Sequence, residues 1–384
     1  MARRQSAAGR HWRLAATAGA VAAGILLTGT VALASPVSVL VGPSWRNVYR
    51  ADLSGSAAFT DIVATGRSNA WAVGARFRRD GTWVSAIASH WNGSRWRLAS
   101  LPVRHFVPET VAASSGRNVW IFGFRITPAG DTTGVGVALH LVGGKWQSVP
   151  LPPQAGNTWN DGSALQAAVF SPSQVWVSAG VQAAPGGSLE TPMWQWTGTN
   201  WAGTTVPGVL TSLSGSSVGN MWATTTPTYG GNETTRSYKF VSSSWQRQSA
   251  PVLSDAGIAV HSRTDIWIAG YTARQWNSDH LYYSTVAHWN GVRWRRYTVV
   301  APGGDKPAAA DGRGGFWAGP LLHEIRGRWY SPASGWLFGS GCEPAGFFGN
   351  MAGIPGTSAW WAAGGCTPGH SHRAEASISI NGKL

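Results

Sequence analysis

Two series of tryptophans recur along this 384-residue chain, and their spacing limits the folds open to it. The first series lies in segments such as NAWAVG, NVWIFG and DIWIAG, and consists of Trp71, Trp120, Trp176, Trp222, Trp267, Trp317 and Trp361. Its members are 44 to 56 residues apart. A period near 45 residues with strand-like content is typical of the blades of a β-propeller, in which each repeat forms one small sheet.

The second series falls in the same units and consists of Trp96, Trp146, Trp201, Trp245, Trp294 and Trp329. Each unit predicts four strands, which we call A to D from the centre of the ring outwards. Strand A is an inner strand such as TDIVAT, and strand B contains the first tryptophan. Strand C is a segment such as AIASHW, and the outer strand D starts at the second tryptophan. Asn-Gly or a similar pair predicts the tight turn between strands C and D. In the sixth unit the two tryptophans are only 12 residues apart, so we expect that unit to lack its long hairpin.

The two ends of the chain complete each other in this scheme. The seventh unit stops at ASISINGKL without an outer strand, whereas PSWRNVY, residues 43–49, supplies Trp45 before the first unit. We therefore predict an all-β, seven-bladed β-propeller with four-stranded blades, closed by pairing of the N-terminal strand with the C-terminal blade. Closure hides strand edges that would otherwise promote aggregation. We expect the tryptophans of both series to pack between blades.

The N-terminal segment has the features of an export signal. Four arginines precede an apolar stretch from Leu14 to Leu33, which ends in the small residues expected at a cleavage site. We predict a cleaved signal peptide over residues 1–34 and a single propeller domain over residues 35–384. An uncleaved N-terminal membrane anchor is the alternative, because the stretch is nearly long enough to span a bilayer. In an exported chain the only two cysteines, Cys342 and Cys366, are expected to form a disulfide.

The segments NAWAVG, HWNG and RW resemble a repeat of secreted actinobacterial proteins that is distantly related to kelch and galactose-oxidase-like propellers. The resemblance covers residues 43–384 and implies a secreted bacterial propeller without implying an activity. The Gly-Gly doublet of kelch blades is absent after strand B. In SHWNGSRW, Trp91 stands where the Asp box of sialidases has its aspartate, so a sialidase is not indicated.

One face of the predicted ring is more variable than the other. The turns between strands A and B and between C and D are short and alike, whereas the BC and DA segments are long and unlike one another. Function tends to reside on variable loops over a repeated scaffold, so we place the binding site on the BC/DA face. Its candidate ligand-binding residues are Arg78, Arg79, Trp83, Trp159, Asp161, Tyr229, Trp276, His280 and Tyr283.

Aromatic rings and guanidinium groups in these loops suit sugar faces and acidic groups. We therefore expect a non-catalytic binding module for an extracellular glycan or cell-wall polymer, including anionic ones. A second hypothesis is a polysaccharide-active hydrolase or lyase, which would bring together residues from the set Asp80, Asp161, Glu190, Asp279 and His280. A third is a platform for a protein partner.

The charge pattern and the candidate metal ligands predict no nucleic acid or metal partner. The formal charge of +14 falls by four without the N-terminal segment and stays positive. Basic residues gather where outer strands begin, as in Arg95 and Arg97, and we interpret them as charges that discourage edge-to-edge pairing. No nucleic-acid-binding motif accompanies them, so no nucleic acid partner is expected. His370 and His372 lack a third ligand, and we expect a monomer with no metal or cofactor.

Overall fold

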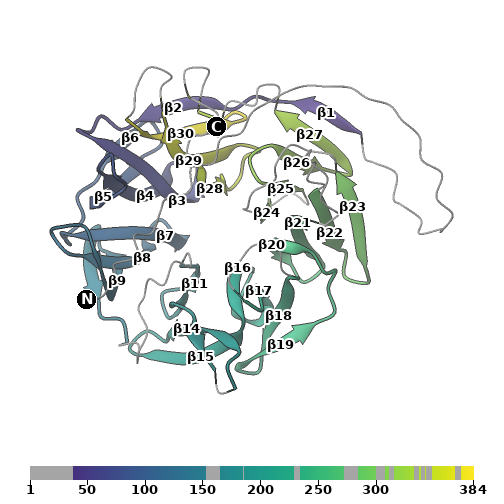
Figure 1. Ribbon diagram of the computed structural model, residues 1–384. Helices are drawn as coiled ribbons and strands as arrows, with labels where there is room; N and C mark the ends of the chain where they lie inside the picture. The colour runs from purple at the N-terminus through teal and green to yellow at the C-terminus, as the bar shows by residue number, and fades with distance from the viewer. Residues whose placement is uncertain are drawn as a thin grey trace, which may run out of the picture.

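The structure is a computed structural model that describes residues 38–152, 165–184, 186–228, 234–271, 284–299, 308–310, 315–332, 337–338, 342, 348–367 and 373–384. In these ranges the chain forms seven sheets arranged around a central axis (Figure 1), which confirms the predicted seven-bladed propeller. The only helical element among the described residues is the 3-10 turn η1 (Val218–Asn220). None of the described residues belongs to a helix with the length and hydrophobicity of a membrane span.

The strands follow the chain from blade to blade. Blade one contains β3 (Ser56–Gly66), β4 (Asn69–Phe77), β5 (Trp83–Trp91) and β6 (Trp96–Leu98). Blade two contains β7 (Phe106–Ser115), β8 (Asn118–Ile126), β9 (Thr132–Val142) and β10 (Lys145–Val149). Blade three contains β11 (Ala167–Ser171), β12 (Gln174–Ser178), β13 (Gln182–Ala183), β14 (Leu189–Trp196) and β15 (Trp201–Pro207). Blade four contains β16 (Val209–Gly215), β17 (Met221–Thr226), β18 (Arg236–Val241) and β19 (Ser244–Gln248).

The remaining blades include both ends of the described chain. Blade five contains β20 (Ser254–Ser262), β21 (Asp265–Tyr271), β22 (Ser284–Trp289) and β23 (Trp294–Val299). Blade six contains β24 (Ala308–Ala310), β25 (Phe316–Ala318), β26 (Leu322–Ile325), β27 (Arg328–Pro332) and β1 (Val39–Gly42). Blade seven contains β28 (Phe348–Gly353), β29 (Trp360–Cys366), β30 (Glu375–Asn381) and β2 (Arg46–Arg50). The short hairpin between β25 and β26 confirms that the sixth unit lacks its long hairpin.

The ring closes as the sequence predicts. Strand β2 pairs antiparallel with β30, with Arg46 opposite Ile380, and the Asn381 side-chain amide donates to the Pro43 carbonyl at 2.6 Å. Two strands were not anticipated. Strand β1 adds a fifth, parallel strand to the outer edge of blade six, where Val39 lies opposite Trp329, and the two-residue β13 pairs with β14 in blade three. The N-terminal part of the chain therefore joins two blades.

The two tryptophan series meet across blade boundaries. The strand B tryptophan of one blade packs against the strand D tryptophan of the next, as in Trp71 with Trp146, whose ring centroids are 5.1 Å apart. The same arrangement joins Trp120 to Trp201, Trp176 to Trp245, Trp267 to Trp329, Trp317 to Trp45 and Trp361 to Trp96. Between blades four and five, Trp222 and Trp294 belong to one hydrophobic cluster. This confirms the predicted packing between blades.

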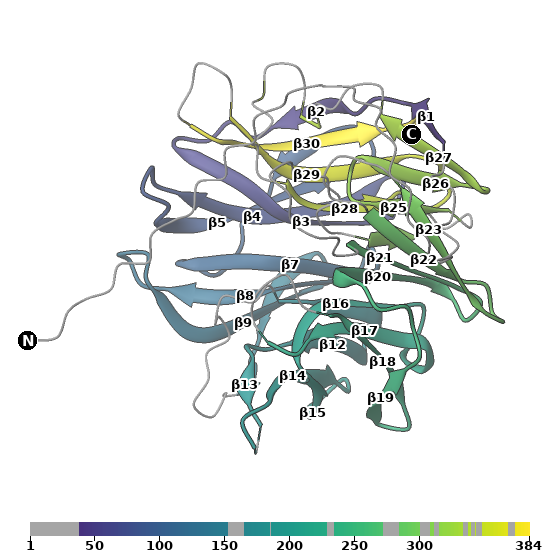
Figure 2. The same ribbon diagram turned by 45° about the vertical axis from the view of Figure 1, so that its right-hand side comes forward.

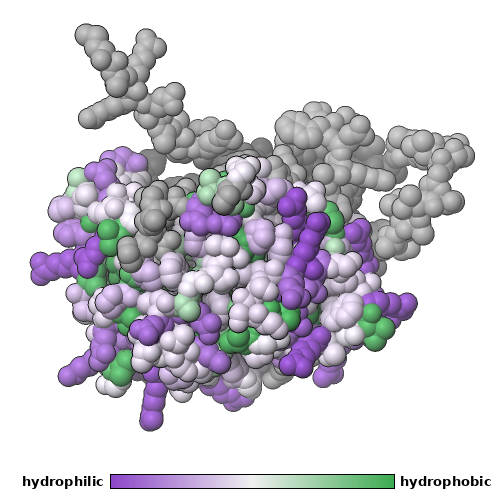
Figure 3. Space-filling view, turned by 90° about the horizontal axis from the view of Figure 1, so that it is seen from below, coloured by the Kyte–Doolittle hydropathy of each residue, from purple (hydrophilic) through white to green (hydrophobic). Residues whose placement is uncertain are grey.

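The hydrophobic core is divided among the blade boundaries. Seven clusters of buried residues each contain side chains from two neighbouring blades, and they include all seven boundaries. Figure 2 shows how each sheet twists between the inner and the outer strand. Figure 3 shows the outside of the ring at blades three and four, where hydrophobic residues form small, separate patches. The apolar surface is therefore buried between blades.

The glycine that ends NAWAVG and NVWIFG is explained by a bulge in the neighbouring inner strand. The pairing register of β3 shifts between Phe59 and Asp61, and that of β7 shifts between Pro108 and Thr110. An added Cβ on Gly74 would lie 2.1 Å from the Ala58 carbonyl oxygen, and one on Gly123 would lie 1.9 Å from the Val107 carbonyl oxygen. Backbone atoms cannot yield as a flexible side chain can, so the repeat requires glycine there.

The two ends of the ring differ as expected. The CD turn of blade one has Gly93 as its first central residue with φ +96°, and the Asn92 side chain accepts hydrogen bonds from the amides of Ser94 and Arg95. The CD turn of blade five repeats this geometry at Asn290, Gly291 and Val292. We call the end that carries the AB and CD turns the short-turn face, and the opposite end, which carries the BC and DA segments, the long-loop face.

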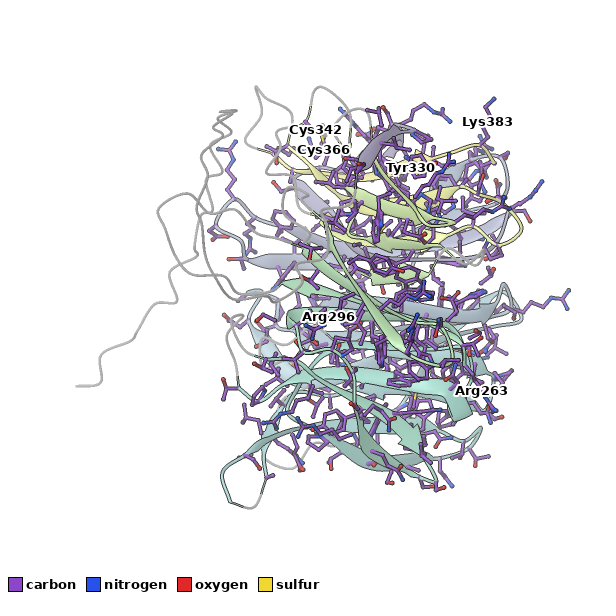
Figure 4. All side chains as sticks on the ribbon, turned by 90° about the vertical axis from the view of Figure 1, so that its right-hand side faces the viewer. Arg263, Arg296, Tyr330, Cys342, Cys366 and Lys383 are labelled. Atoms are coloured by element: carbon purple, nitrogen blue, oxygen red, sulfur yellow. A yellow bond between two sulfur atoms is a disulfide. The ribbon has the colours of Figure 1, made fainter. Side chains whose placement is uncertain are left out.

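The predicted disulfide is present at the long-loop face. Cys342 and Cys366 are bonded, with Cα atoms 5.2 Å apart, and the bond joins the segment before β28 to the end of β29. Figure 4 shows this pair at the opposite end of the ring from Arg263 and Lys383, which lie at the short-turn face. The Arg50 guanidinium lies 3.6 Å from the Cys342 sulfur and 3.6 Å from the Glu375 carboxylate.

Candidate functional site

The BC hairpins of blades one to three end in the same type of turn. In blade one, the Arg78 amide donates to the Thr82 carbonyl at 2.8 Å, and the Gly81 amide donates back to the Arg78 carbonyl at 3.0 Å. The same two bonds occur over residues 127–131 and 184–188. The fourth residue of each turn is a glycine with φ between +84° and +99°, namely Gly81, Gly130 and Gly187. This is a three-residue hairpin loop closed by a glycine bulge.

The hairpins of blades one and two are held to each other. The Arg78 guanidinium donates to the Ala129 carbonyl at 3.1 Å, across the boundary between the two blades. Gly130 packs so closely on the first hairpin that an added Cβ would lie 2.3 Å from the Thr82 methyl and 2.5 Å from the Trp83 carbonyl oxygen. We call these two turns, residues 78–83 and 127–131, the hairpin pair. It is a preformed projection of the long-loop face.

Trp83 is an anchor of the hairpin pair as well as a surface residue. Its ring packs edge-on against Phe77, with centroids 6.2 Å apart, and it lies against a small cluster that includes Phe124 and Ile126 of blade two. It is half-buried, so part of the ring remains accessible. Arg79, by contrast, is exposed. A ligand at the hairpin pair would meet the Arg79 guanidinium and the accessible part of Trp83.

The acid of the first hairpin is used to close its turn. Asp80 accepts a hydrogen bond from the Thr82 amide at 2.9 Å, and this bond lowers the pKa of the exposed Asp80 carboxyl below its usual range. In blade three, Glu190 accepts a hydrogen bond from the Gln182 side-chain amide at 2.6 Å. Both carboxylates therefore take part in local contacts of their own hairpins.

The other candidate residues lie outside the described part of the chain. They are Trp159, Asp161, Tyr229, Trp276, His280 and Tyr283, together with Asp279 of the enzyme hypothesis. The structure therefore places Arg78, Arg79 and Trp83 together on one hairpin, and the proposed contribution of the remaining residues stays a prediction.

A buried carboxylate that the sequence analysis overlooked lies on the innermost strand of blade one. Asp61 accepts hydrogen bonds from the Thr110 hydroxyl at 2.7 Å and the Val111 amide at 2.8 Å in blade two, and from the Asn350 side-chain amide at 2.7 Å in blade seven. Burial raises the pKa of Asp61 above its usual range, although the bond from the Val111 amide opposes the shift. An aspartate inside the apolar strand segment TDIVAT was the available signal.

The position after the inner-strand bulge links blades elsewhere too. In blade four it is Ser212, whose hydroxyl accepts from the Ile258 amide of blade five at 3.2 Å. The Glu109 carboxylate of blade two, within the bulge of β7, accepts from the Leu165 amide of the chain entering blade three at 3.0 Å. These polar side chains near the axis connect neighbouring blades, and we assign them a structural role.

The recurring histidines of strand C are structural. His140 stacks on Trp120 with ring centroids 4.1 Å apart, and both rings bond to the Asn118 side-chain oxygen. In blade five, His288 stacks on Trp267 and Asp265 replaces the asparagine. The Asn or Asp two residues before each tryptophan was not recognised as part of this unit.

Blade one keeps the stack but lacks these bonds. His90 stacks on Trp71 with centroids 4.4 Å apart, while Asn69 accepts from the Thr65 hydroxyl instead. Neither Trp71 Nε1 nor His90 Nε2 has a hydrogen-bond partner among the described residues. Burial lowers the pKa of both His90 and His140. In the described ranges, no three His, Cys, Asp or Glu side chains gather in a way that could hold a metal ion.

Comparison with solved structures identifies the fold. A structure of YCF48 bound to D1 peptide has a TM-score of 0.55 and 15% sequence identity, and the match covers 91% of this chain and 99% of that chain. The β-propeller domain of the Trilobed protease from Pyrococcus furiosus has a TM-score of 0.53 and 10% identity, with 88% and 95% covered. The acylaminoacyl peptidase of Pyrococcus horikoshii has a TM-score of 0.52 and 8% identity, with 84% of this chain and 51% of that chain covered.

No protein-family description matches the chain, and no curated protein matches it in sequence. At identities of 15% and below, the structural likeness shows the fold and not the activity. The chain is a seven-bladed β-propeller, a fold that serves binding proteins and enzymes alike.

Proposed function

We propose that this protein is a secreted, non-catalytic binding propeller that engages an anionic extracellular glycan or cell-wall polymer through its long-loop face. The observation that carries this proposal is the hairpin pair. Its turns are fixed by backbone hydrogen bonds, and the Arg78 guanidinium binds Ala129 of the next blade. A surface that is already ordered loses little conformational entropy when a ligand binds.

The chemistry of the hairpin pair suits an acidic sugar. Arg79 presents a planar guanidinium with five donors, which matches the geometry of a carboxylate or a phosphate. The accessible part of the Trp83 ring offers a flat apolar surface of the kind that packs on sugar rings. The positive charge of the chain adds long-range attraction for a polyanion.

Binding is favoured over hydrolysis by the contacts of the nearby acids. Glycoside hydrolysis requires two carboxyl groups that face each other across the scissile bond. Asp80 and Glu190 instead accept hydrogen bonds within their own hairpins. The polysaccharide-active enzyme remains the alternative hypothesis, and Asp161, Asp279 and His280, on which it depends, lie outside the described residues.

The proposal includes export and processing. Residues 1–34 would act as the signal peptide, and residues 35–384 would form the mature single-domain protein. The similarity of NAWAVG and HWNG to a repeat of secreted actinobacterial propellers supports this part of the proposal. The bond between Cys342 and Cys366 supports it too, since disulfides persist mainly in oxidising compartments.

A protein partner is the second candidate, and one comparison favours it. The matched YCF48 structure contains a bound peptide, and the match covers almost the whole of that chain. A peptide with acidic side chains would satisfy Arg79 as well as an acidic sugar does. The two hypotheses differ in one respect, because only the glycan hypothesis requires retention of the chain on a polysaccharide.

The experiment is retention of the chain from Ser35 onward on acidic and neutral polysaccharide resins at low and high salt. We expect retention on the acidic resin that weakens with salt, because screening reduces charge attraction. The Arg79→Gln variant should elute several-fold earlier. The Arg97→Gln variant, which changes another exposed arginine on the outer strand β6, should elute with the parent chain. Absence of retention on every polysaccharide would overturn the glycan-binding proposal. Cleavage of the polymer would favour the polysaccharide-active enzyme instead.

A further inference from the structure

The short-turn face carries a one-sided charge. Its described turns hold nine exposed basic residues, which are Arg67, Arg95, Arg117, Lys145, Arg263, Arg293, Arg326, Arg328 and Lys383. As far as the structure describes these turns, two acids lie in or beside them: Asp265, whose carboxylate bonds to Trp267 and His288, and the buried Glu324, whose carboxylate accepts from the Gly327 amide. Figure 4 shows Arg263 and Lys383 projecting from this end of the ring at well-separated heights. The basic residues therefore present unbalanced charge over a wide surface.

The charge covers an arc and not the whole ring. The nine residues, which we call the basic arc, belong to blades five, six, seven, one and two, which are consecutive around the ring. In blades three and four, the corresponding turns at 171–174, 197–200, 215–220 and 241–244 contain no charged residue. A role in preventing edge-to-edge pairing does not explain this pattern, because every blade has an outer edge and the turns lie at the ends of the strands.

Apolar side chains stand beside the basic residues in the same turns. Val142, Val292 and Ile325 are exposed in the CD turns of blades two, five and six, and Val292 is 82% exposed. Each lies within three residues of a basic residue of the arc. Exposed apolar side chains contribute nothing to binding a hydrated polyanion, but they are stabilised in the interfacial region of a bilayer.

The chain also enters the ring at this face. Val39, the first residue of β1, lies opposite Trp329, which follows the CD turn of blade six by one residue. The apolar stretch that ends at Leu33 precedes Val39 by six residues, a length that spans at most about 20 Å. Before the signal peptide is cleaved, a bilayer that holds this stretch would therefore lie within about 20 Å of the short-turn end of blade six.

We propose that the basic arc of the short-turn face docks the propeller on a membrane surface rich in anionic phospholipid. The arginine and lysine side chains bind the lipid phosphates, and Val142, Val292 and Ile325 enter the headgroup region. Each basic residue near such a surface adds attraction that falls off within a Debye length. The long-loop face then points away from the membrane, toward the extracellular ligand of the proposed function.

The test uses the chain from Ser35 onward, which contains every strand from Val39 to Asn381 and lacks the apolar stretch. Co-sedimentation is measured with vesicles of phosphatidylcholine alone and with vesicles that also contain phosphatidylglycerol. We expect binding only to the second kind. The variant R95Q/R263Q/R293Q/K383Q should bind at least tenfold more weakly. The control R104Q/R125Q/R236Q/R247Q removes four exposed arginines outside the short-turn face and should bind like the parent chain.

A second pair of variants separates a lipid surface from a soluble polyanion. The CD turns Asn92–Arg95 and Asn290–Arg293 share the amide bonds to the asparagine side chain and differ only in Ser94 against Val292, where the Ser94 hydroxyl adds a bond to Asn92 at 2.9 Å. Val292→Ser should therefore keep the fold and weaken vesicle binding several-fold, and Ser94→Val should strengthen it, while elution from a polyglutamate resin stays the same for both.

Three outcomes would overturn the proposal: no binding to phosphatidylglycerol vesicles, equal binding by the two fourfold variants, or no effect of Val292→Ser on vesicles. Retention on polyglutamate that the variant R95Q/R263Q/R293Q/K383Q loses, without vesicle binding by the parent chain, would replace the lipid by an anionic polymer. The variants of the short-turn face leave the long-loop face unchanged, so the proposed glycan function keeps its own test.

Discussion

The indole of Trp361 on blade seven packs edge-on against the indole of Trp96 on blade one, with ring centroids 5.3 Å apart and an interplanar angle of 79°. The two residues are 265 positions apart in the sequence, and their contact joins the last blade to the first. Both rings are buried, at 1% and 6% exposure. The same contact between a strand B and a strand D tryptophan joins consecutive blades elsewhere in the ring. Between blades seven and one it closes the ring.

Trp96→Ala should destabilise the whole propeller. A buried tryptophan replaced by alanine costs about 3–5 kcal/mol, and here the loss falls at the closing boundary. Thermal unfolding followed by circular dichroism should show a large drop in Tm. Leu98→Ala is the control, because Leu98 lies on the same strand and is 47% exposed. Similar Tm values for the two variants would contradict a role of this contact in closure.

Gly123→Ala should be far more harmful than Gly66→Ala. The added methyl group at Gly123 would meet the Val107 carbonyl oxygen at 1.9 Å, whereas nothing lies within 4 Å of the position it would take at Gly66. Overpacking of this kind costs about 1–3 kcal/mol or more, because backbone must move. Urea unfolding of both variants measures the difference, and equal midpoints would show that the bulge does not require glycine.

Acidification should weaken the ring through the stacked histidines. Burial lowers the pKa of His90 and His140, so the unfolded chain takes up protons more readily than the folded chain. The stability they add is present above their unfolded pKa of about 6.5 and is lost as the pH falls below it. Tm should therefore decline between pH 7 and pH 5.

Blade three shows which residue can replace these histidines without a titrating group, because Gln195 lies opposite Trp176 at the position that histidine holds in blades one and two. A His90→Gln/His140→Gln chain should lose less Tm over the same pH range than the parent chain. The two histidines would have no part in the acid response if both chains declined in parallel.

Replacing Cys342 and Cys366 by serine should lower stability without opening the ring. The disulfide closes a loop of 24 residues, and the chain-entropy argument assigns such a loop about 3 kcal/mol. The blade boundaries that hold the core involve other side chains, so near-ultraviolet circular dichroism of the tryptophans should stay unchanged below Tm. Loss of that signal at room temperature would mean that the bond is needed for the tertiary packing.

The repeat made most of the fold predictable. Seven units follow from the spacing of the tryptophans, and the missing outer strand of the last unit pointed to residues 43–49. Strand β1 was not predictable in the same way, because VLVG has no tryptophan and its pairing partner lies almost three hundred residues away. The role of Asp61 was missed for a related reason, since its four hydrogen-bond donors come from three different blades.

The site was less accessible from sequence than the scaffold. Arg78 was chosen as a ligand-binding residue, but its guanidinium bonds to Ala129 and helps to hold the hairpin pair. That contact joins two variable loops, which no repeat spacing relates. The basic arc was visible as individual arginines, but its restriction to five consecutive blades appears only when the turns are arranged around the ring.

The proposed function assigns the extracellular glycan to the long-loop face and not to the basic arc. The most direct measurement is retention on an acidic polysaccharide resin of three chains: the parent, Arg79→Gln, and R95Q/R263Q/R293Q/K383Q. We expect Arg79→Gln to lose retention although it removes only one charge, and the fourfold variant to keep a retention close to that of the parent chain. Loss of retention by the fourfold variant alone would overturn this assignment and place glycan binding on the short-turn face.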